Sequence, residues 1–413
     1  MRRKWIQERQ NMKKAFVLGG TVPHKALIEK LKGMGYYTVL IDYTNHPPAA
    51  SAADLHLKES TLDKEKVLEL AKEYKVDLVI STCIDQANST ACYVAEKLGL
   101  PHPYSFATSL DVTRKGQMKK IFKAYGIPTS DFYILDQYVA EEPRLPFPLV
   151  VKPTDANSSK GVFKVETTAD FLEKLKISFS FSREGKTIVE RFVSGTEIQV
   201  DCYAENGIAK VLMTKDKKLM QLDGKELQMS GFSIPGNLCE RHRDELQNIA
   251  QKIVTAFHLE TTPFFYQAVC NDDGIFVLEF APRIAGGTTY EMVEIYSGVD
   301  YLDAAIKSFL HETPTVNPVR NFNKYSVEIL YMKPGTFDHV DGLEELISSG
   351  ELMHYFPFAN KGKKISASIN SGNRIGGIMA KGQSYEEIEI KLKKAMQKIA
   401  VIDDQGRDLS YWK

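Results

Sequence analysis

The sequence predicts a parallel α/β domain followed by α+β lobes. The first observation is an alternation of short apolar runs and helical patterns over about the first hundred residues, which is typical of a parallel sheet flanked by helices. The second is a change in the residue pattern near Asp111, after which segments with strand character and a hairpin signal dominate. The third is size: 413 residues, 43% of them hydrophobic, can bury a sizeable core, so about two to four domains are expected.

The α/β region is predicted from apolar runs that end in turn or polar residues and are followed by amphipathic helical patterns. Since the carboxyl ends of parallel strands meet at one edge of a sheet, ligand contacts are expected there. Strands are expected over 14–18, 36–42 and 76–82. Helices are expected through Ala26, Leu27 and Leu31, ending near Gly33 and Gly35, and over 64–73 and 91–98. Candidate contacts are Gly19, Gly20, Asp42 and the segment 82–86.

The second half begins with a charged helix over 113–126 and continues in short apolar segments with strand character. The runs 264–270 and 275–280 are separated by Asn271, Asp272, Asp273 and Gly274, which indicates a β-hairpin. Further strands are expected within 146–153, 186–192 and 196–207, and further helices over 243–257 and, in the final mixed lobe, over 386–399.

Charge and cysteine usage exclude several function classes. Fifty-three Lys and Arg residues balance fifty-three Asp and Glu residues, so the basic excess that drives binding to nucleic acid or anionic lipid is missing. Five scattered cysteines show no C-x-x-C pair, which argues against a disulfide framework or a zinc site. We find no apolar segment of signal-peptide or membrane-spanning length, so a cytoplasmic protein is expected. Met12 opens a sequence that itself looks like a protein start, and residues 1–12 are treated as an N-terminal extension.

Several common motifs fail. Gly19 and Gly20 follow a strand, but His24 stands near the place of the third glycine of G-x-G-x-x-G, so a nicotinamide-binding site is disfavoured. The run 242–244 reads His-Arg-Asp without the other kinase motifs, and the P-loop, G-x-S-x-G and H-E-x-x-H motifs do not occur. A nucleotide would therefore be held by another arrangement.

A different set of residues suits phosphoryl transfer to a carboxylate, which requires cations, oxygen ligands for a metal and a cover that excludes water. Lys152 ends an apolar strand, and the small-residue loop 154–161 that follows allows backbone N–H groups to approach a polyphosphate. The hairpin sets Gln267 and Glu279 on facing strands, and Arg283 follows just beyond Pro282.

The order of these residues along about 170 positions resembles the ATP-grasp superfamily, in its carbamoyl-phosphate-synthetase-like and biotin-carboxylase-like branch, which includes the bacterial L-amino-acid ligases. The resemblance covers nearly everything after Met12. It implies a pre-ATP-grasp α/β domain over 13–110, an ATP-grasp domain over 111–311 whose two α+β lobes clasp ATP, with a lid subdomain at about 128–195, and a C-terminal α+β lobe over 312–413.

The resemblance also implies roles for individual residues. Catalysis would fall to Arg283 and Lys152, metal binding to Glu279 and Gln267, and the carboxylate substrate to Arg283, Gly286 and Gly287. Two departures are visible: Arg114 stands where relatives have Asp, and Ala281 stands where the family has the Asn that assists a second metal ion. The implied ATP-binding residues are Lys115, Lys152, Ser158, Ser159, Lys160, Gly161, Glu190, Arg191, Val193 and Glu197.

The function implied is an ATP-dependent carboxylate–amine ligase that forms an acyl phosphate and releases ADP and phosphate. ATP and Mg²⁺, or Mn²⁺, are the expected cofactors, and a small carboxylate and a small amine are the expected partners. A homodimer is compatible with the resemblance, because related ligases are frequently dimers. Two alternatives stay open: bicarbonate activation of the biotin-carboxylase or carbamoyl-phosphate-synthetase kind, and an ATP-binding module without catalysis.

Overall fold

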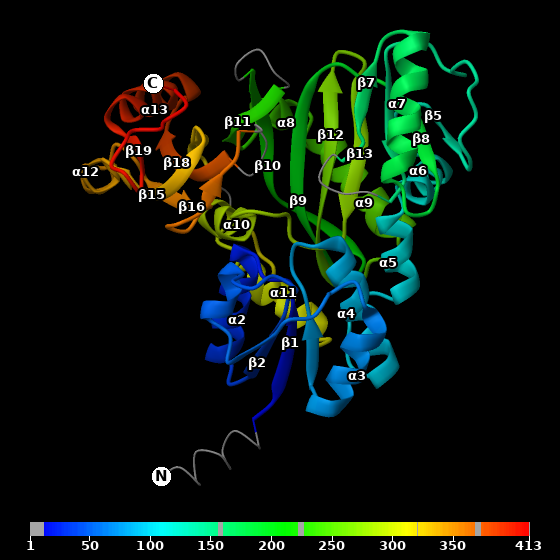
Figure 1. The fold of residues 1–413 in the computed structure, drawn as a ribbon, viewed down its shortest axis with the longest axis horizontal. Helices are drawn as coiled ribbons and strands as arrows, with labels where there is room; N and C mark the ends of the chain where they lie inside the picture. The colour runs from blue at the N-terminus through cyan, green and yellow to red at the C-terminus, as the bar shows by residue number, and fades with distance from the viewer. Residues whose placement is uncertain (1–11, 156–159, 222–226, 320, 368–372, 413) are drawn as a thin grey trace. The chain divides into compact units, whose positions relative to one another are not determined.

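The computed structural model describes residues 12–155, 160–221, 227–319, 321–367 and 373–412 (Figure 1). The chain divides into two compact units. The first comprises Met1–Val211, Asp244–Gly286 and Asp300–Val316, and the second comprises Leu212–Arg243, Gly287–Val299 and Asn317–Lys413. The domain boundaries implied by the resemblance, after residues 110 and 311, stay a prediction.

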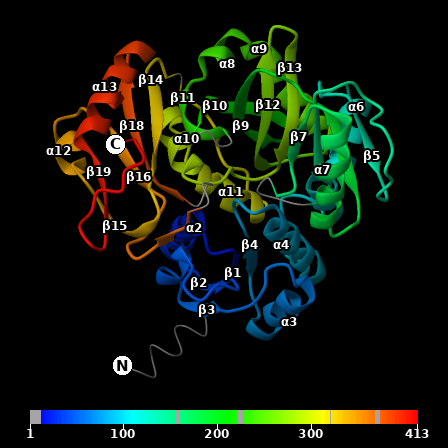
Figure 2. The ribbon, with the colours of Figure 1, turned by 45° about the horizontal axis from the view of Figure 1, so that its top comes forward.

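The first unit begins with a four-stranded sheet in the order β3-β2-β1-β4, and all three pairings are parallel. Helices surround this sheet in Figure 2, and its central strand β1 is buried from Ala15 to Leu18. The predicted parallel α/β architecture is confirmed. Its elements are β1 (Lys14–Leu18), α2 (Val22–Gly33), β2 (Tyr37–Ile41), the 3₁₀ turn η1 (Pro48–Ser51), β3 (Leu55–Leu57), α3 (Lys64–Tyr74), β4 (Leu78–Ile80) and α4 (Asp85–Leu98).

A second, antiparallel sheet in the same unit has the order β5-β8-β6-β7. The helix α7 packs on it through Phe171 and Leu175, which share a core with Leu149, Val151 and Val189. These elements are α5 (Phe106–Thr113), α6 (Lys115–Ala124), β5 (Phe132–Leu135), β6 (Leu149–Pro153), β7 (Phe163–Val165), α7 (Thr168–Phe181) and β8 (Thr187–Arg191).

The rest of the first unit contains the predicted hairpin. The hairpin strand β12 pairs with β13 on one side and with β9 on the other, antiparallel in both cases. Buried tyrosines tie helices to this sheet: Tyr266 donates to the carbonyl of Leu246, and Tyr301 donates to the carbonyl of Cys202. The elements are β9 (Thr196–Glu205), α9 (Arg243–Ala256), β12 (Thr262–Asn271), β13 (Gly274–Ala281) and α11 (Tyr301–Phe309).

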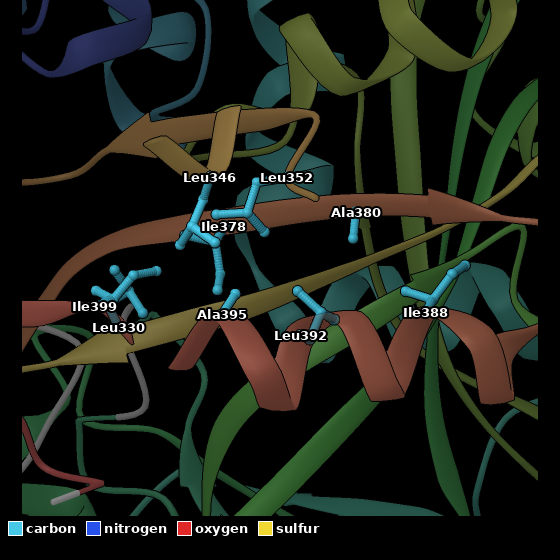
Figure 3. Packing of buried hydrophobic residues seen from close by; sticks show 9 residues of the cluster. All are labelled: Leu330, Leu346, Leu352, Ile378, Ala380, Ile388, Leu392, Ala395 and Ile399. Carbon is cyan, nitrogen blue, oxygen red and sulfur yellow. The ribbon is translucent and has the colours of Figure 1, made fainter. Parts of the chain in front are cut away.

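In the second unit the strands β11, β14, β18 and β16 pair in this order, and a long helix packs on them. Figure 3 shows Leu392 and Ala395 of that helix directed at Leu330 and Ile378 of the sheet. A small sheet in the order β17-β15-β19 completes the unit. The chain enters it along β10 (Ile208–Gln221), and the other elements are β11 (Leu227–Ile234), α8 (Asn237–Arg241), α10 (Thr289–Ser297), β14 (Lys324–Tyr331), β15 (Gly335–Asp341), α12 (Leu343–Ser348), β16 (His354–Pro357), β17 (Lys364–Ile365), β18 (Arg374–Gly382), α13 (Tyr385–Lys398) and β19 (Ala400–Asp403).

Within the described ranges, no helix combines the length and the apolar character needed to cross a membrane.

Candidate functional site

Glu190 is the centre of a buried group of charges in the first unit. One carboxylate oxygen lies 2.7 Å from Lys152 Nζ and the other 3.3 Å from Lys119 Nζ, and the Ser130 hydroxyl donates to the second oxygen. Strand pairing explains the first contact: Glu190 faces Val150, so Lys152, two residues further on the same face, is its diagonal neighbour. The side chains of Glu190 and Lys119 are only 4% and 1% exposed, so water hardly reaches them.

The charges of this group change one another's ionisation. Burial would raise the pKa of Glu190, but Lys119 and Lys152 outweigh burial and lower that pKa to about 2. For Lys119, burial is the larger effect and lowers its pKa to about 8, although Glu190 opposes this change. Two ammonium groups share one carboxylate when Lys119 is protonated, and the remaining positive charge favours an anionic ligand.

Lys115 lies in the same electrostatic neighbourhood. It is the first residue of α6, and its backbone N–H donates to the carbonyl of Thr154 (3.0 Å), which holds the start of the helix against the end of β6. Burial lowers the pKa of Lys115, Glu279 raises it and Lys152 lowers it. Because such effects fall with distance, Lys152 and Glu279 lie near enough to Lys115 to act on its charge.

Of the loop after β6, the structure describes Thr154, Asp155, Lys160 and Gly161. Ser158 and Ser159 lie outside the described residues, and Lys160 is exposed. Gly161 has φ +71°, and a Cβ atom at this position would lie 3.0 Å from Phe181 and from Pro153. The backbone conformation and the close neighbours therefore both require glycine here.

The predicted adenine and ribose positions follow β8. Arg191 is exposed, Val193 is half-buried, and the backbone N–H of Arg191 donates to the carbonyl of Asp131 (2.9 Å). Glu197 is half-buried near the start of β9, where it pairs with Val269 of β12. Arg191 is the last residue of β8, Val193 lies in the connection after it, and Glu197 is the second residue of β9, which belongs to a different sheet.

The hairpin brings the two predicted metal ligands opposite each other. Gln267 of β12 pairs with Glu279 of β13, next to an irregularity in the strand register. Gln267 Nε2 donates to Gln199 Oε1 (3.3 Å), and Gln199 Nε2 donates to Asp201 Oδ1 (2.8 Å). Among the described residues, no group of three or more His, Cys, Asp or Glu side chains could hold a metal. A metal here would therefore bind few protein ligands.

Ala281 ends the strand that carries Glu279. It is buried and packs with Phe265 and Ala285. A methyl group offers no ligand atom, so this position gives no assistance to a second metal ion.

Arg283 is fixed by a bidentate ion pair. Its Nε and Nη2 donate to the two carboxylate oxygens of Asp85, at 2.5 and 2.8 Å, and its Nη1 donates to the carbonyl of Ile284. Its guanidinium carbon lies 5.1 Å from the ring centre of Phe265. The guanidinium is thus oriented before any ligand arrives. Gly286 and Gly287, just beyond it, are exposed, and Gly287 has φ +69°.

Sequence reasoning missed Lys119 and Ser130 and included Asp85 only within a segment of candidate contacts. One signal for Lys119 was available: it follows Lys115 by four residues and stands between Met118 and Phe122 on the apolar face of a predicted helix. A lysine on an apolar face requires a buried partner, but the sequence does not say that Glu190 supplies it.

Two family models match the chain. Residues 145–291 match the ATP-grasp domain, and residues 328–403 match the L-amino acid ligase C-terminal domain 2. The first match contains every described residue of the proposed site except Lys115, Lys119, Ser130 and Asp85.

Named relatives support the same grouping. The chain is 24% identical over 302 residues to a D-alanine--D-alanine ligase of Francisella philomiragia, covering 70% of this chain and 91% of the relative. It is also 24% identical over 296 residues to an L-arginine-specific L-amino acid ligase of Bacillus subtilis, covering 69% and 70%. The solved structure of an L-amino acid ligase from Bacillus licheniformis shares the fold, with a TM-score of 0.76 and 21% identity over 95% of this chain and 99% of that one.

Proposed function

This chain is an ATP-grasp ligase, an enzyme that forms carbon–nitrogen bonds and produces ADP, and on that premise we propose that it joins a carboxylate to an amine through an acyl phosphate. The observation that carries the proposal is the orientation of Arg283, which lies four residues after Glu279 in the chain. The carboxylate of Asp85 holds its guanidinium in place. A guanidinium that is already oriented stabilises developing negative charge without reorganising during the reaction.

The nucleotide would be held by the cations of the first unit. We assign Lys115 and Lys152 to the phosphates, with the loop that ends at Lys160 and Gly161, and includes Ser158 and Ser159, as their cover. Both oxygens of Glu190 face lysines, so its carboxylate would serve the nucleotide by holding Lys152 in place. The backbone at Arg191 and Val193 would contact the adenine of ATP. Glu197 would bind the ribose hydroxyls.

The proposed reaction has two steps. A carboxylate oxygen of the substrate attacks the γ-phosphorus of ATP, and ADP leaves with the electrons of the broken bond. The amine then attacks the acyl carbon, phosphate leaves, and the nitrogen loses a proton. Arg283 would orient the carboxylate and stabilise charge on the transferred group, while Gly286 and Gly287 would let the substrate approach the backbone.

The residues present fit a sparse magnesium site. Mg²⁺ binds oxygen, keeps several waters and uses one or two carboxylates together with substrate phosphates. Glu279 supplies a carboxylate and Gln267 an amide oxygen from the paired strand. When bound, the ion would neutralise phosphate charge.

The experiment measures ADP and phosphate release over a matrix of acids and amines. Amino acids form the first panel, because the relatives are named D-alanine--D-alanine ligase and L-arginine-specific L-amino acid ligase. ADP should appear with both substrates, or with one acid and hydroxylamine, which traps an acyl phosphate. AMP as the product would refute the mechanism.

The variant Lys152→Ala should lower the rate by about 10²-fold or more, because it removes a cation from the transferring phosphates. Lys164→Ala is the matched control, since Lys164 lies in the same sheet but is 45% exposed and pairs with Glu166. Bicarbonate belongs in the acid panel, because turnover with bicarbonate alone would favour carboxylase-like activation. ATP binding in calorimetry without turnover anywhere in the matrix would favour a module without catalysis.

A further inference from the structure

A cavity of about 670 Å³ lies within the second unit, on the face of the sheet that α13 covers. Glu328 and Ser230 belong to the sheet side, and Leu392, Lys393 and Met396 belong to α13. Figure 3 shows the neighbouring core, in which Leu392 and Ile388 of α13 point toward the sheet. None of the residues that line the cavity belongs to the nucleotide, metal or substrate positions proposed above.

Glu328 is a carboxylate in a position that normally belongs to the core. It lies in the middle of β14, between Gly231 of β11 and Ile378 of β18. Side chains alternate along a strand, so Glu328 shares the face of Leu330, which packs against α13. Its partner Gly231 has no side chain, and a Cβ atom there would lie 3.3 Å from Glu328 Oε2. The carboxylate is therefore bordered by bare backbone on one side.

No hydrogen bond or ion pair to Glu328 occurs among the residues that the structure describes. Burial raises its pKa to about 7, Lys218 lowers it and Glu389 raises it. Lys218 is itself shared with Glu389, whose Oε1 lies 3.5 Å from Lys218 Nζ. A largely buried carboxylate without a close cation is costly, and a ligand that brings a cation would remove that cost.

Besides Glu328, the cavity is lined by four apolar residues, Leu219, Leu392, Met396 and Trp412, and by the polar residues Lys218, Ser230, Glu389, Lys393 and Gln397. Leu219 stands at its open side with 44% exposure, and Leu392 is buried. Trp412 closes another wall, and its indole N–H donates to the carbonyl of Met396 (2.8 Å), which fixes the ring. The exposed Lys393 forms no ion pair with the residues that the structure describes. A ligand thus meets the Glu328 carboxylate, an apolar surface, the Lys218–Glu389 ion pair and the exposed Lys393.

We propose that this cavity binds a primary amine that carries an apolar chain, with its ammonium group on Glu328 and its chain against Leu392, Met396 and Trp412. A free amino acid with an apolar side chain fits best, because Lys393 then pairs with its carboxylate. Binding requires neither ATP nor a metal, since no residue of either proposed site takes part. The proposal therefore goes beyond the ligase reaction and does not depend on it.

The test measures direct binding of small amines to the full chain without nucleotide. The fluorescence of Trp412 reports the binding. The chain has a second tryptophan, Trp5, so the measurement uses a Trp5→Phe background. Three probes with the same isobutyl chain separate the contacts: L-leucine, 3-methylbutylamine, which lacks the carboxylate, and 4-methylpentanoate, which lacks the amine. Leucine and 3-methylbutylamine should shift the emission in a saturable way, and 4-methylpentanoate should not.

Variants then assign the contacts. Glu328→Gln should weaken the binding of both amines about tenfold or more, because it removes a charge-assisted hydrogen bond. Glu344→Gln, at an exposed position of α12, is the matched control. Lys393→Gln should weaken the binding of leucine and leave the binding of 3-methylbutylamine unchanged. Arg283→Gln should leave both amines bound, which separates this cavity from the proposed substrate site.

Affinity for 3-methylbutylamine should rise as the pH increases through about 7, because Glu328 must be ionised in the complex. Lys218, Glu389 and Lys393 are the charged groups that line the cavity with it. The proposal is overturned if neither amine binds at tens of millimolar, if 4-methylpentanoate binds as well as the amines, or if Glu328→Gln binds like the parent.

Discussion

Replacing Glu190 by Gln should destabilise the first unit strongly. The substitution keeps the size of the side chain but removes the charge that faces Lys119 and Lys152. Removing one partner of a buried ion pair leaves its cation uncompensated, which typically costs about 3–5 kcal/mol. The variant therefore tests whether these charges depend on one another as the structure indicates.

The pKa values give the magnitude for this protein. The pKa of Glu190 falls from an ordinary 4.5 to about 2 in the folded state. At about 1.4 kcal/mol for each pH unit between the two values, the ionised carboxylate stabilises the fold by about 3 kcal/mol. Because the folded pKa is the lower one, this contribution is present above pH 4.5 and is lost as the pH falls toward about 2.

The charge of Lys119 has the opposite effect on the stability of the fold. Burial lowers its pKa from 10.5 to about 8, so its charge costs about as much at pH 7 as the carboxylate contributes. The cost disappears above pH 10.5, where the lysine is neutral in both states. The intact pair thus adds little net stability, but the loss of Glu190 alone should cost about 3 kcal/mol at pH 7 and less at pH 9.5.

Urea unfolding followed by circular dichroism at both pH values measures this cost. Lys119→Met combined with Glu190→Gln should recover about 2 kcal/mol relative to Glu190→Gln alone, because the buried charge is then removed as well. Lys120→Met, at an exposed position of α6, is the control and should recover nothing. A loss below about 1 kcal/mol for Glu190→Gln, with no recovery in the double variant, would refute the reasoning.

Three further predictions concern single residues. Asp85→Asn should lower kcat by about 10–100-fold in the ADP-release assay while the chain stays folded, because Arg283 loses its charged partner. Glu328→Gln should stabilise the second unit by up to about 3 kcal/mol in urea at pH 8 and by nothing at pH 4, because a raised pKa makes the carboxylate costly only as it ionises. Cys83, although burial opposes its ionisation, has its pKa lowered to about 7 by His24 and should react with iodoacetamide with a midpoint near pH 7, a reaction that Cys83→Ser should abolish.

The sequence specifies the hairpin of the site well. Two apolar runs around Asn271 and Gly274 predict paired strands, and the structure pairs Gln267 with Glu279 as expected. Strand pairing is set by the turn and by alternation, which are local features. For this reason the residue pattern alone is enough to set the two proposed metal ligands opposite each other.

The start of α4 could not be predicted in the same way. The expected helix was 91–98, whereas the observed helix begins at Asp85. Its first turns contain polar residues that read as a loop, but Asn88 and Ser89 donate to the carbonyls of Ile84 and Asp85 four residues earlier. These hydrogen bonds let polar side chains be buried within a helix. Asp85 thereby becomes the first residue of a rigid element, which holds it against Arg283.

Two glutamates show why residue type alone does not determine the sign of an effect. Glu190 and Glu328 both lie on strands, the first buried and the second half-buried, yet the pKa of the first falls to about 2 and that of the second rises to about 7. The difference is the partner: two lysines contact Glu190, whereas Lys218 acts on Glu328 only from a distance and is shared with Glu389. The same change from Glu to Gln should therefore destabilise one unit and stabilise the other at pH 8. If Glu328→Gln instead destabilised the second unit at pH 8, the Glu328 carboxylate would already be compensated in the fold, and the case for a cation-binding cavity there would fail.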